Sequence, residues 1–269
     1  MNATGLLAVP TAANPTSLVV FAHPFGTNAT LFRTGLEQVA AGGALAVAMD
    51  YRGDHPWKVQ AGANDTVAAT LAVKAAWPSV NLTILYGWSM GGEVSGMAVA
   101  QAPNGTFDYW LDGAGVADLA ATWQEDHAVQ SLIEQETGGT PSQVPAAYSQ
   151  RSPVDLAPQM ASKGLQRAYL VYAPGDTWVS AEQAERLYQA LASAGMHVTY
   201  YTVPTDVNPW ACAPAVLVCG PEPPAGPASH EVGGLRLMMP LIQDRLNRVP
   251  DAADPAVRAV YEGITGTRT

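Results

Sequence analysis

The stretch "LTILYGWSMGGEVSGMAVAQ", residues Leu82–Gln101, changes character halfway along its length. Its first part is an apolar run, and from about Met90 it continues as a helix-like segment rich in small residues. This change of pattern predicts a buried strand followed by a helix. Ser89 stands at the junction, with Gly87 and Gly91 two residues away on either side.

A serine in this setting matches the Gly-x-Ser-x-Gly pattern between a strand and a helix. Ser89 must turn the chain sharply, and Gly87 and Gly91 remove the side chains that would collide there. The turn lifts the hydroxyl clear of the sheet at the start of a helix, where backbone N–H groups favour developing negative charge. The pattern therefore predicts Ser89 as a nucleophile. The alternative is a glycine-rich structural turn with an idle serine.

Apolar, β-branched runs alternate with longer helix-like segments along the 269 residues. This alternation indicates an α/β fold, with a mostly parallel twisted sheet and helices on both faces. We expect strands near Leu18–Ala22, Ala44–Met49, Leu82–Tyr86, Tyr109–Leu111, Ala168–Tyr172 and Val198–Val203. We expect helices near Leu31–Ala41, Asp65–Ala76, Gly91–Gln101, Ala181–Ala194 and Leu235–Asn247.

Two segments interrupt this alternation. Residues 116–167 form a partly helical, cap-like excursion, and residues 204–229 form a proline-rich insert. Loops of this length inside a compact domain are usually functional covers or disordered segments. We predict a single domain over residues 1–269 that carries these two additions.

A serine hydroxyl is a weak nucleophile and needs a base that a third group orients. Where this strand–turn–helix pattern occurs, the chain order is serine, acid, histidine. His230 follows a loop and precedes the last predicted helix, as a base should. His127 lies in the excursion, and His197 lies in a predicted strand, where it is expected to be a sheet residue. We favour His230 as the base, with His127 as the alternative.

The acid should follow a late strand at the same edge of the sheet. In "AYLVYAPGDTWVSAEQAERL" a predicted strand leads through a Pro-Gly turn to Asp176. A carboxylate at this place can accept a hydrogen bond from the imidazole and fix its tautomer. We favour Asp176, and Asp206, just past the last predicted strand, is the rival. The alternative for Asp176 is that it only organises its turn.

The oxyanion that forms during acyl transfer needs two preorganised donors. The backbone N–H of Met90, directly after the nucleophile, is the first candidate. The loop in "VVFAHPFGTN" supplies the second, and we favour the N–H of Phe25 because Pro24 has none. His23 is expected to brace this loop.

Composition and charge exclude several classes of protein. Hydrophobic residues make up 48% and charged residues 13% of the chain, which is a globular composition. The formal net charge of -10 disfavours nucleic acid as a partner. No apolar run approaches the roughly 18 residues of a membrane span. Neither a metal nor an organic cofactor is implied by the residues.

Cys212 and Cys219 lie close together in the insert and are the only two cysteines. Their spacing suits a local disulfide in an exported protein or two free thiols in the cytosol, and a metal site would need more ligands nearby. The stretch "MNATGLLAVP" lacks the basic start and long apolar core of a signal peptide. These two observations do not decide the cellular compartment. We favour a secreted or extracytoplasmic location over the cytoplasm.

Aromatic residues flank the chemical motifs. Phe25, Trp88 and Trp178 stand beside the motifs, and Trp210 lies in the insert. Together they favour a substrate with a hydrophobic or aromatic group, although ordinary core packing is the alternative for each ring. We expect Trp210 to wall the substrate entrance, with a Cys212–Cys219 bond fixing the wall.

Five motifs carry a family resemblance, in the order "AHPFG", "MDYRG", "GWSMGG", "YAPGDTWVS" and "SHEVGG". Together they resemble the α/β-hydrolase family of serine hydrolases. The stretches "SPVDLAPQ" and "YLVYAPGDTWVSAEQAERLYQAL" are similar to the catalytic domain of prolyl-oligopeptidase-type proteins and related esterases. The hexapeptide "GWSMGG" is also similar to that of cutinase-like polyester hydrolases. The chain departs from the family in its His-Pro-Phe-Gly loop and in the length of its insert.

The resemblance implies Ser89 as nucleophile, Asp176 as acid and His230 as base, with the N–H groups of Phe25 and Met90 as oxyanion donors. We expect a carboxylic-ester hydrolase acting on small-molecule or polymeric esters, including polyester-like ones. A serine peptidase or amidase with the same residues is the second hypothesis. A catalytically idle binding protein with this fold is the third.

Overall fold

The computed structural model of the chain describes residues 3–11, 14–173, 176–202, 228–235, 237–249 and 267–268. An eight-stranded sheet runs through this part of the chain, in the order β1-β3-β2-β4-β5-β6-β7-β8. The strands are β1 (Gly5–Ala8), β2 (Ser17–Ala22), β3 (Leu45–Met49), β4 (Leu82–Trp88), β5 (Tyr109–Gly113), β6 (Arg167–Tyr172), β7 (Val198–Thr202) and β8 (Thr267–Arg268). β1 and β8 pair antiparallel with their neighbours, whereas β3, β2, β4, β5, β6 and β7 run parallel.

The central strand β4 shows why the sequence reads as an unbroken apolar run there. All of its residues are buried, because helices cover both faces of a parallel sheet. In the register of the sheet, Gly87 lies between Ala22 on β2 and Asp112 on β5. The carboxyl ends of these strands therefore meet at one edge, which is where open α/β sheets bind their ligands.

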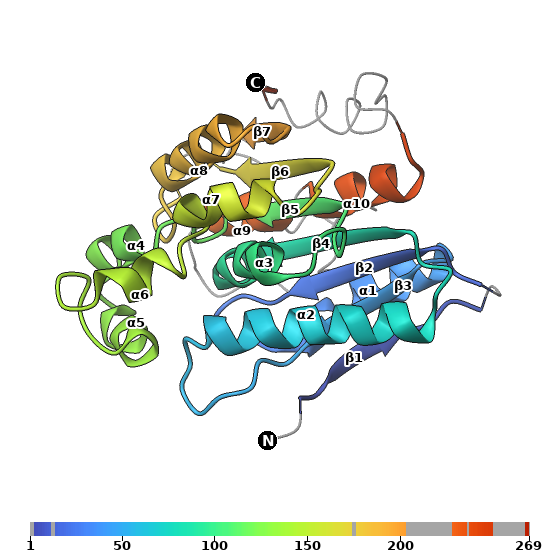
Figure 1. Cartoon of the computed structure of the whole chain (residues 1–269), viewed down its shortest axis with the longest axis horizontal. Coiled ribbons are helices and arrows are strands. Elements are labelled where there is room, and N and C mark those ends of the chain that lie inside the picture. Colours follow the sequence, from blue (N-terminus) through green and yellow to red (C-terminus); the bar gives the residue numbers. More distant parts are fainter. Residues whose placement is uncertain are drawn as a thin grey trace.

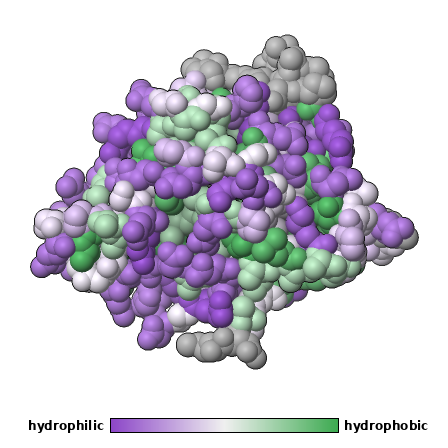
Figure 2. Space-filling model, viewed as in Figure 1, coloured by the Kyte–Doolittle hydropathy of each residue, from purple (hydrophilic) through white to green (hydrophobic). Residues whose placement is uncertain are grey.

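The helices form two layers around this sheet (Figure 1). They are α1 (Arg33–Ala41), α2 (Val59–Ala76), α3 (Met90–Gln101), α4 (Leu119–Glu125), α5 (Gln130–Thr137), α6 (Pro145–Ser149), α7 (Pro153–Ala161), α8 (Ala181–Ser193), α9 (Ala228–Leu235) and α10 (Met238–Leu246), with a 3₁₀ turn η1 (Ala29–Phe32). α2, α3, α7 and α8 pack in a row on one face, and α1, α9 and α10 lie on the other. The face turned to the viewer in Figure 2 is mostly hydrophilic, with apolar residues gathered in smaller patches.

The predicted α/β-hydrolase fold is confirmed, and all six predicted strands are present. The edge strands β1 and β8 were not predicted, since runs of four and two residues carry little pattern. The expected helix Leu235–Asn247 is wrong in its start: α9 already begins at Ala228, and α10 is a separate helix. Glycines 233 and 234 disfavour a helix by propensity, and tertiary packing overrides that preference.

The excursion at residues 116–167 contains four helices. α7 packs between α3 and α8 as part of the layer on the sheet. α4, α5 and α6 project beyond the end of the sheet in Figure 1. No helix within the described ranges combines the length and the apolar character that a membrane crossing requires.

Candidate active site

Ser89 occupies a strained turn between β4 and α3. Its φ of 58° and ψ of -126° place a non-glycine residue in a region that few side chains adopt. A methyl group at Gly87 would collide with Gly91 and Ser95, and one at Gly91 would collide with Ala22. The glycine spacing therefore has the steric role that the sequence pattern predicts, with Ser89 at the start of the helix.

His230 and Asp176 form the second part of the site. His230 Nδ1 donates a hydrogen bond of 2.7 Å to Asp176 Oδ2, and both side chains are buried. Asp176 Oδ1 accepts from the backbone N–H groups of Trp178 and Val179, at 2.9 and 3.1 Å. The carboxylate thus organises its own turn and orients the imidazole at once. Among the described residues, His230 Nε2 has no hydrogen-bond partner.

The other histidines lie elsewhere. His127 is exposed in the turn between α4 and α5. The expected place of His197 in a strand is wrong, because the residue precedes β7 and is exposed, and only its carbonyl joins the sheet by accepting from the Ala168 N–H. His230 also differs from expectation, since it lies inside α9 rather than in front of a helix. The rival acid Asp206 lies outside the described residues.

The loop after β2 carries Phe25, one of the two expected oxyanion donors. His23 stacks on Tyr51 with ring centroids 3.8 Å apart, and its Nδ1 donates to the Pro24 carbonyl at 2.9 Å. Thr27 Oγ1 donates to the same carbonyl, also at 2.9 Å. Burial lowers the pKa of His23, so its ring is a neutral brace. Met90 is the first residue of α3, where backbone N–H groups have no intrahelical acceptor.

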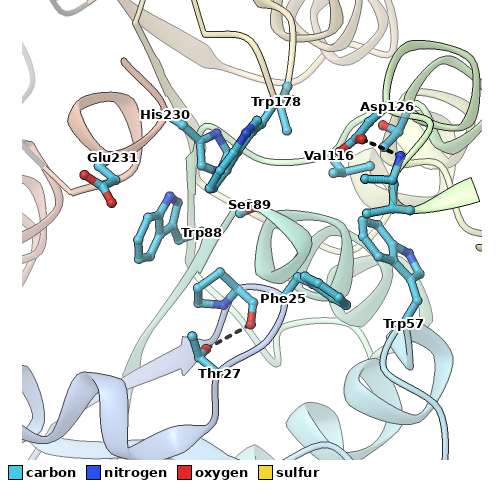
Figure 3. A pocket seen from close by; sticks show the side chains of 15 residues that line it. Phe25, Thr27, Trp57, Trp88, Ser89, Val116, Asp126, Trp178, His230 and Glu231 are labelled. Carbon is cyan, nitrogen blue, oxygen red and sulfur yellow. Dashed lines mark hydrogen bonds between the residues drawn. The ribbon is translucent and has the colours of Figure 1, made fainter. Parts of the chain in front are cut away.

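A cavity of about 440 Å³ joins these parts (Figure 3). Figure 3 shows Ser89 between two groups of rings, with Trp88 and His230 on one side and Phe25 and Trp57 on the other. The ring centroids of Trp88 and Trp178 lie 6.0 and 5.2 Å from that of His230. The lining residues are Pro24, Phe25, Thr27, Trp57, Trp88, Ser89, Val116, Thr122, Asp126, Ala128, Val129, Trp178, Val179, His230 and Glu231.

Sequence reasoning missed Trp57 and the wall that α4 and the α4–α5 turn provide. Trp57 follows β3 and pairs with Phe25 at 5.6 Å, while its Nε1 donates to the buried carboxyl of Glu93 at 3.2 Å. The position of Trp57 past the carboxyl end of a strand was the available signal. Thr122 and Asp126 had no such signal, because a chain excursion brings them to the cavity.

Two polar side chains fasten the projecting helices to the body of the molecule. The buried Gln183 on α8 accepts from the N–H groups of Ala117 and Asp118, at 3.2 and 3.1 Å. Glu136 on α5 accepts from the Gln60 N–H and pairs with Arg151, each at 3.1 Å. The wall of the cavity is therefore held by hydrogen bonds at both of its ends.

Trp210, Cys212 and Cys219 lie outside the described residues, so their expected roles stay predictions. Trp88 and Trp178 do line the cavity.

Comparisons with known proteins agree with this architecture. A profile of the prolyl oligopeptidase family matches residues 32–208, more than half of the chain. The uncharacterized peptidase YtmA of Bacillus subtilis is 28% identical over 127 residues, which cover 46% of this chain and 48% of that protein. The chain thus spans about half the length of this curated relative.

Solved structures of both peptidases and esterases are similar. The uncomplexed acylaminoacyl peptidase of Pyrococcus horikoshii aligns over 95% of this chain and 41% of its own, with 14% identity and a TM-score of 0.64. The propionate-bound esterase Est2 of Thermogutta terrifontis aligns over 76% of this chain and 79% of its own, with 18% identity and a TM-score of 0.57. At these identities the likeness shows the α/β-hydrolase fold alone.

The fold and the family match together place the chain in the α/β-hydrolase class. More narrowly, the chain belongs to the prolyl oligopeptidase family. The predicted family resemblance is therefore confirmed.

Proposed function

We propose that the protein hydrolyses carboxylic esters through an acyl-enzyme on Ser89. The observation that carries the proposal is the 2.7 Å hydrogen bond between His230 and Asp176, made by a ring that shares an apolar cavity with Ser89. This arrangement has the base and orienting acid that a serine nucleophile needs. The substrate is a small-molecule or polymeric ester, and the chain acts as a single hydrolase domain.

Each residue has a defined role in the proposed reaction. Ser89 Oγ attacks the ester carbonyl while His230 Nε2 takes its proton, and Asp176 stabilises the imidazolium that forms. The N–H groups of Phe25 and Met90 bind the oxyanion. His230 then returns the proton to the leaving alcohol. Water, activated by the same imidazole, cleaves the acyl-enzyme.

The cavity wall supports an ester over a peptide. A bound peptide needs partners for its amide groups, because buried polar groups left unpaired are costly. The lining is dominated by tryptophan, phenylalanine, valine, alanine and proline, and its polar side chains apart from Ser89 and His230 are Thr27, Thr122, Asp126 and Glu231. Membership of the prolyl oligopeptidase family favours the second candidate, a peptidase or amidase with the same residues.

Matched substrates separate these candidates. We expect kcat/KM to be higher for a 4-nitrophenyl ester than for the 4-nitroanilide of the same acyl group. The ratio of the two values should exceed the ratio of the rates at which the two substrates hydrolyse without enzyme. An anilide turned over as well as its ester would establish the peptidase instead. Labelling by a fluorophosphonate tests the third candidate, an idle binding protein, because only an activated serine reacts. Ser89→Ala is the control for labelling at this residue.

Exposed aromatic rings support a hydrophobic or aromatic ester. Trp178 is 50% and Phe25 37% exposed, and both line the cavity. Such rings suit a flat apolar group, including an aromatic unit of a polyester-like chain. We expect Trp178→Ala to lower kcat/KM for benzoate esters more than for acetates. Equal losses for both substrates would remove the ring from substrate recognition.

The insert before His230 completes the proposal, on sequence grounds alone. We propose a Cys212–Cys219 disulfide and a substrate-facing Trp210, since the insert leads directly into the segment that carries His230. Thiol counting in denaturant on an oxidatively prepared sample tests the bond: two free thiols would exclude it. Trp210→Ala should then shift the ratio of bulky to small ester turnover.

A further inference from the structure

A buried carboxyl beneath the serine turn has no part in the proposed reaction. Asp112 lies on β5, opposite Gly87 of β4, and is almost fully buried. Its carboxyl packs against Gly92 in the first turn of α3 and against Gly115 after β5, where an added methyl group would collide with it. The packing places an ionisable group against α3, which follows Ser89, and against the turn after β5.

The Tyr172 hydroxyl contacts two acceptors, and their geometry bears on the protonation state of Asp112. The Tyr172 hydroxyl lies 2.7 Å from Asp112 Oδ2 and 2.8 Å from the Gly115 carbonyl oxygen. A phenol has one proton and can donate to only one of two acceptors. Both contacts are hydrogen bonds if Asp112 is protonated, because the acid then donates to Tyr172 and Tyr172 donates to Gly115.

The surroundings agree with a neutral acid. Within the described part of the chain, Tyr86 on β4 and Tyr172 on β6 are the titratable groups that interact with Asp112, and burial raises the pKa of both phenols well above the usual value. α3 presents Gly92 at this contact, and no ion pair with Asp112 exists within the described residues. Burial raises the pKa of Asp112 to about 7, against the lowering effect of the Tyr172 hydrogen bond.

The turn after β5 connects this acid to the nucleophile. The Ser89 N–H donates to the Gly113 carbonyl, and the Val116 N–H donates to the Ser89 carbonyl, each at 3.1 Å. Ala114, between them, has a φ of 45°, which is strained for alanine. The hydrogen bond from Tyr172 to Gly115 therefore holds a strained turn that makes two of the backbone contacts of Ser89.

We propose that Asp112 is a positioning residue, which holds the turn beneath Ser89 only while its carboxyl is protonated. On ionisation, Tyr172 donates to the carboxylate and the Gly115 carbonyl loses its donor, because a charged acceptor binds the proton more strongly. The turn then relaxes and Ser89 loses reactivity. This inference rests on Ser89 as the nucleophile, and it holds for an ester or an amide substrate.

The test is the rate of inactivation by a fluorophosphonate between pH 5 and 10, which reports the reactivity of the serine without choosing a substrate. In the unmodified enzyme the rate should fall about tenfold per pH unit above about pH 7. Asp112→Asn, a neutral donor of the same shape, should keep the rate on the acid side and lose the fall. Persistence of the fall in Asp112→Asn would overturn the inference.

Two further variants complete the test. Glu93→Gln is the matched control, because Glu93 is also a buried carboxyl of raised pKa but contacts Trp57 rather than the turn; it should keep the alkaline fall, and loss of the fall would overturn the inference. Tyr172→Phe should react about tenfold more slowly, without an alkaline fall, and this variant decides if Asp112→Asn does not fold. A Tyr172→Phe profile like that of the unmodified enzyme would overturn the inference. Labelling of Ser89→Ala would also overturn it, because Ser89 would then not be the nucleophile on which the inference rests.

Discussion

The serine turn and the histidine helix reach one cavity by different means. Ser89 is placed by its immediate neighbours, since Gly87, Gly91 and the start of α3 lie within two residues of it. His230 is 54 residues from Asp176, and α9 holds it against β5 and β6. A local steric rule places the first residue, whereas contacts between distant segments place the second.

The contacts of α9 are correspondingly tight. The Tyr86 hydroxyl on β4 donates a hydrogen bond to the Gly234 carbonyl. A methyl group at Gly234 would collide with the indole of Trp88, and one at Gly113 would collide with the Gly234 backbone. Close backbone approach, rather than helix propensity, fixes where His230 sits. The histidine side of the site should therefore be more sensitive to packing changes than the serine side.

The largest expected effect comes from Ser89→Ala. This variant should lose turnover by about 10⁴-fold or more, because the nucleophile is gone, while its melting temperature stays close to that of the unmodified protein. Ester hydrolysis by purified protein measures the first quantity, and thermal unfolding measures the second. Near-normal hydrolysis would end the assignment of Ser89.

A similar loss is expected for His230→Ala, for the same chemical reason. Residues that act as one unit are not additive, so the Ser89→Ala/His230→Ala double variant should be hardly slower than either single variant. His127→Ala and His197→Ala are the controls, because both side chains are exposed and neither is among the residues that line the cavity. An inactive His127→Ala together with an active His230→Ala would refute the assigned base.

A smaller effect, on packing rather than chemistry, is expected from Gly234→Ala. The added methyl group should displace α9 from Trp88, lower kcat by about tenfold to a hundredfold, and destabilise the fold by about 1–3 kcal/mol as other overpacked sites do. Tyr86→Phe removes the hydrogen bond to the same residue without adding an atom and should cost about 1 kcal/mol. Denaturant unfolding and ester kinetics measure both; an unaffected Gly234→Ala would contradict the close approach.

The last expected effect touches stability alone, as a pH dependence that comes from Asp112. Its pKa is raised from 3.8 to about 7 on folding, so the folded state binds more protons and the unfolding free energy falls as pH rises from about 4 to about 7. The slope is at most about 1.4 kcal/mol per pH unit. Asp112→Asn should remove this contribution. The unfolding free energy of the variant minus that of the unmodified protein should therefore rise with pH across that window and be constant above it. A difference independent of pH would contradict a neutral Asp112 at low pH.

Much of the site could be predicted because its signals are local. The Gly-x-Ser-x-Gly spacing predicts the turn at Ser89, since only glycine leaves room for the neighbouring backbone. The strand and Pro-Gly turn before Asp176 predict a carboxylate at the carboxyl edge of the sheet, and the structure pairs it with His230. The alternation of strands and helices likewise predicts the order of the elements along the chain.

Other features depend on which surfaces meet in three dimensions. Trp57 reaches the cavity because Glu93 and Phe25 pack against it, and no pattern in "DHPWK" predicts those two partners. Glycines 233 and 234 argue against a helix, yet the missing side chain of Gly234 is what permits the contact with Trp88. The raised pKa of Asp112 follows from burial, which exists only in the folded chain. The sequence by itself therefore determined the order of the elements and the turn at Ser89, because short-range steric contacts and the spacing of apolar residues encode them. Only the tertiary structure decided which residues wall the cavity and how far burial raises the pKa of Asp112, because desolvation and contacts between distant segments arise only when the chain has folded.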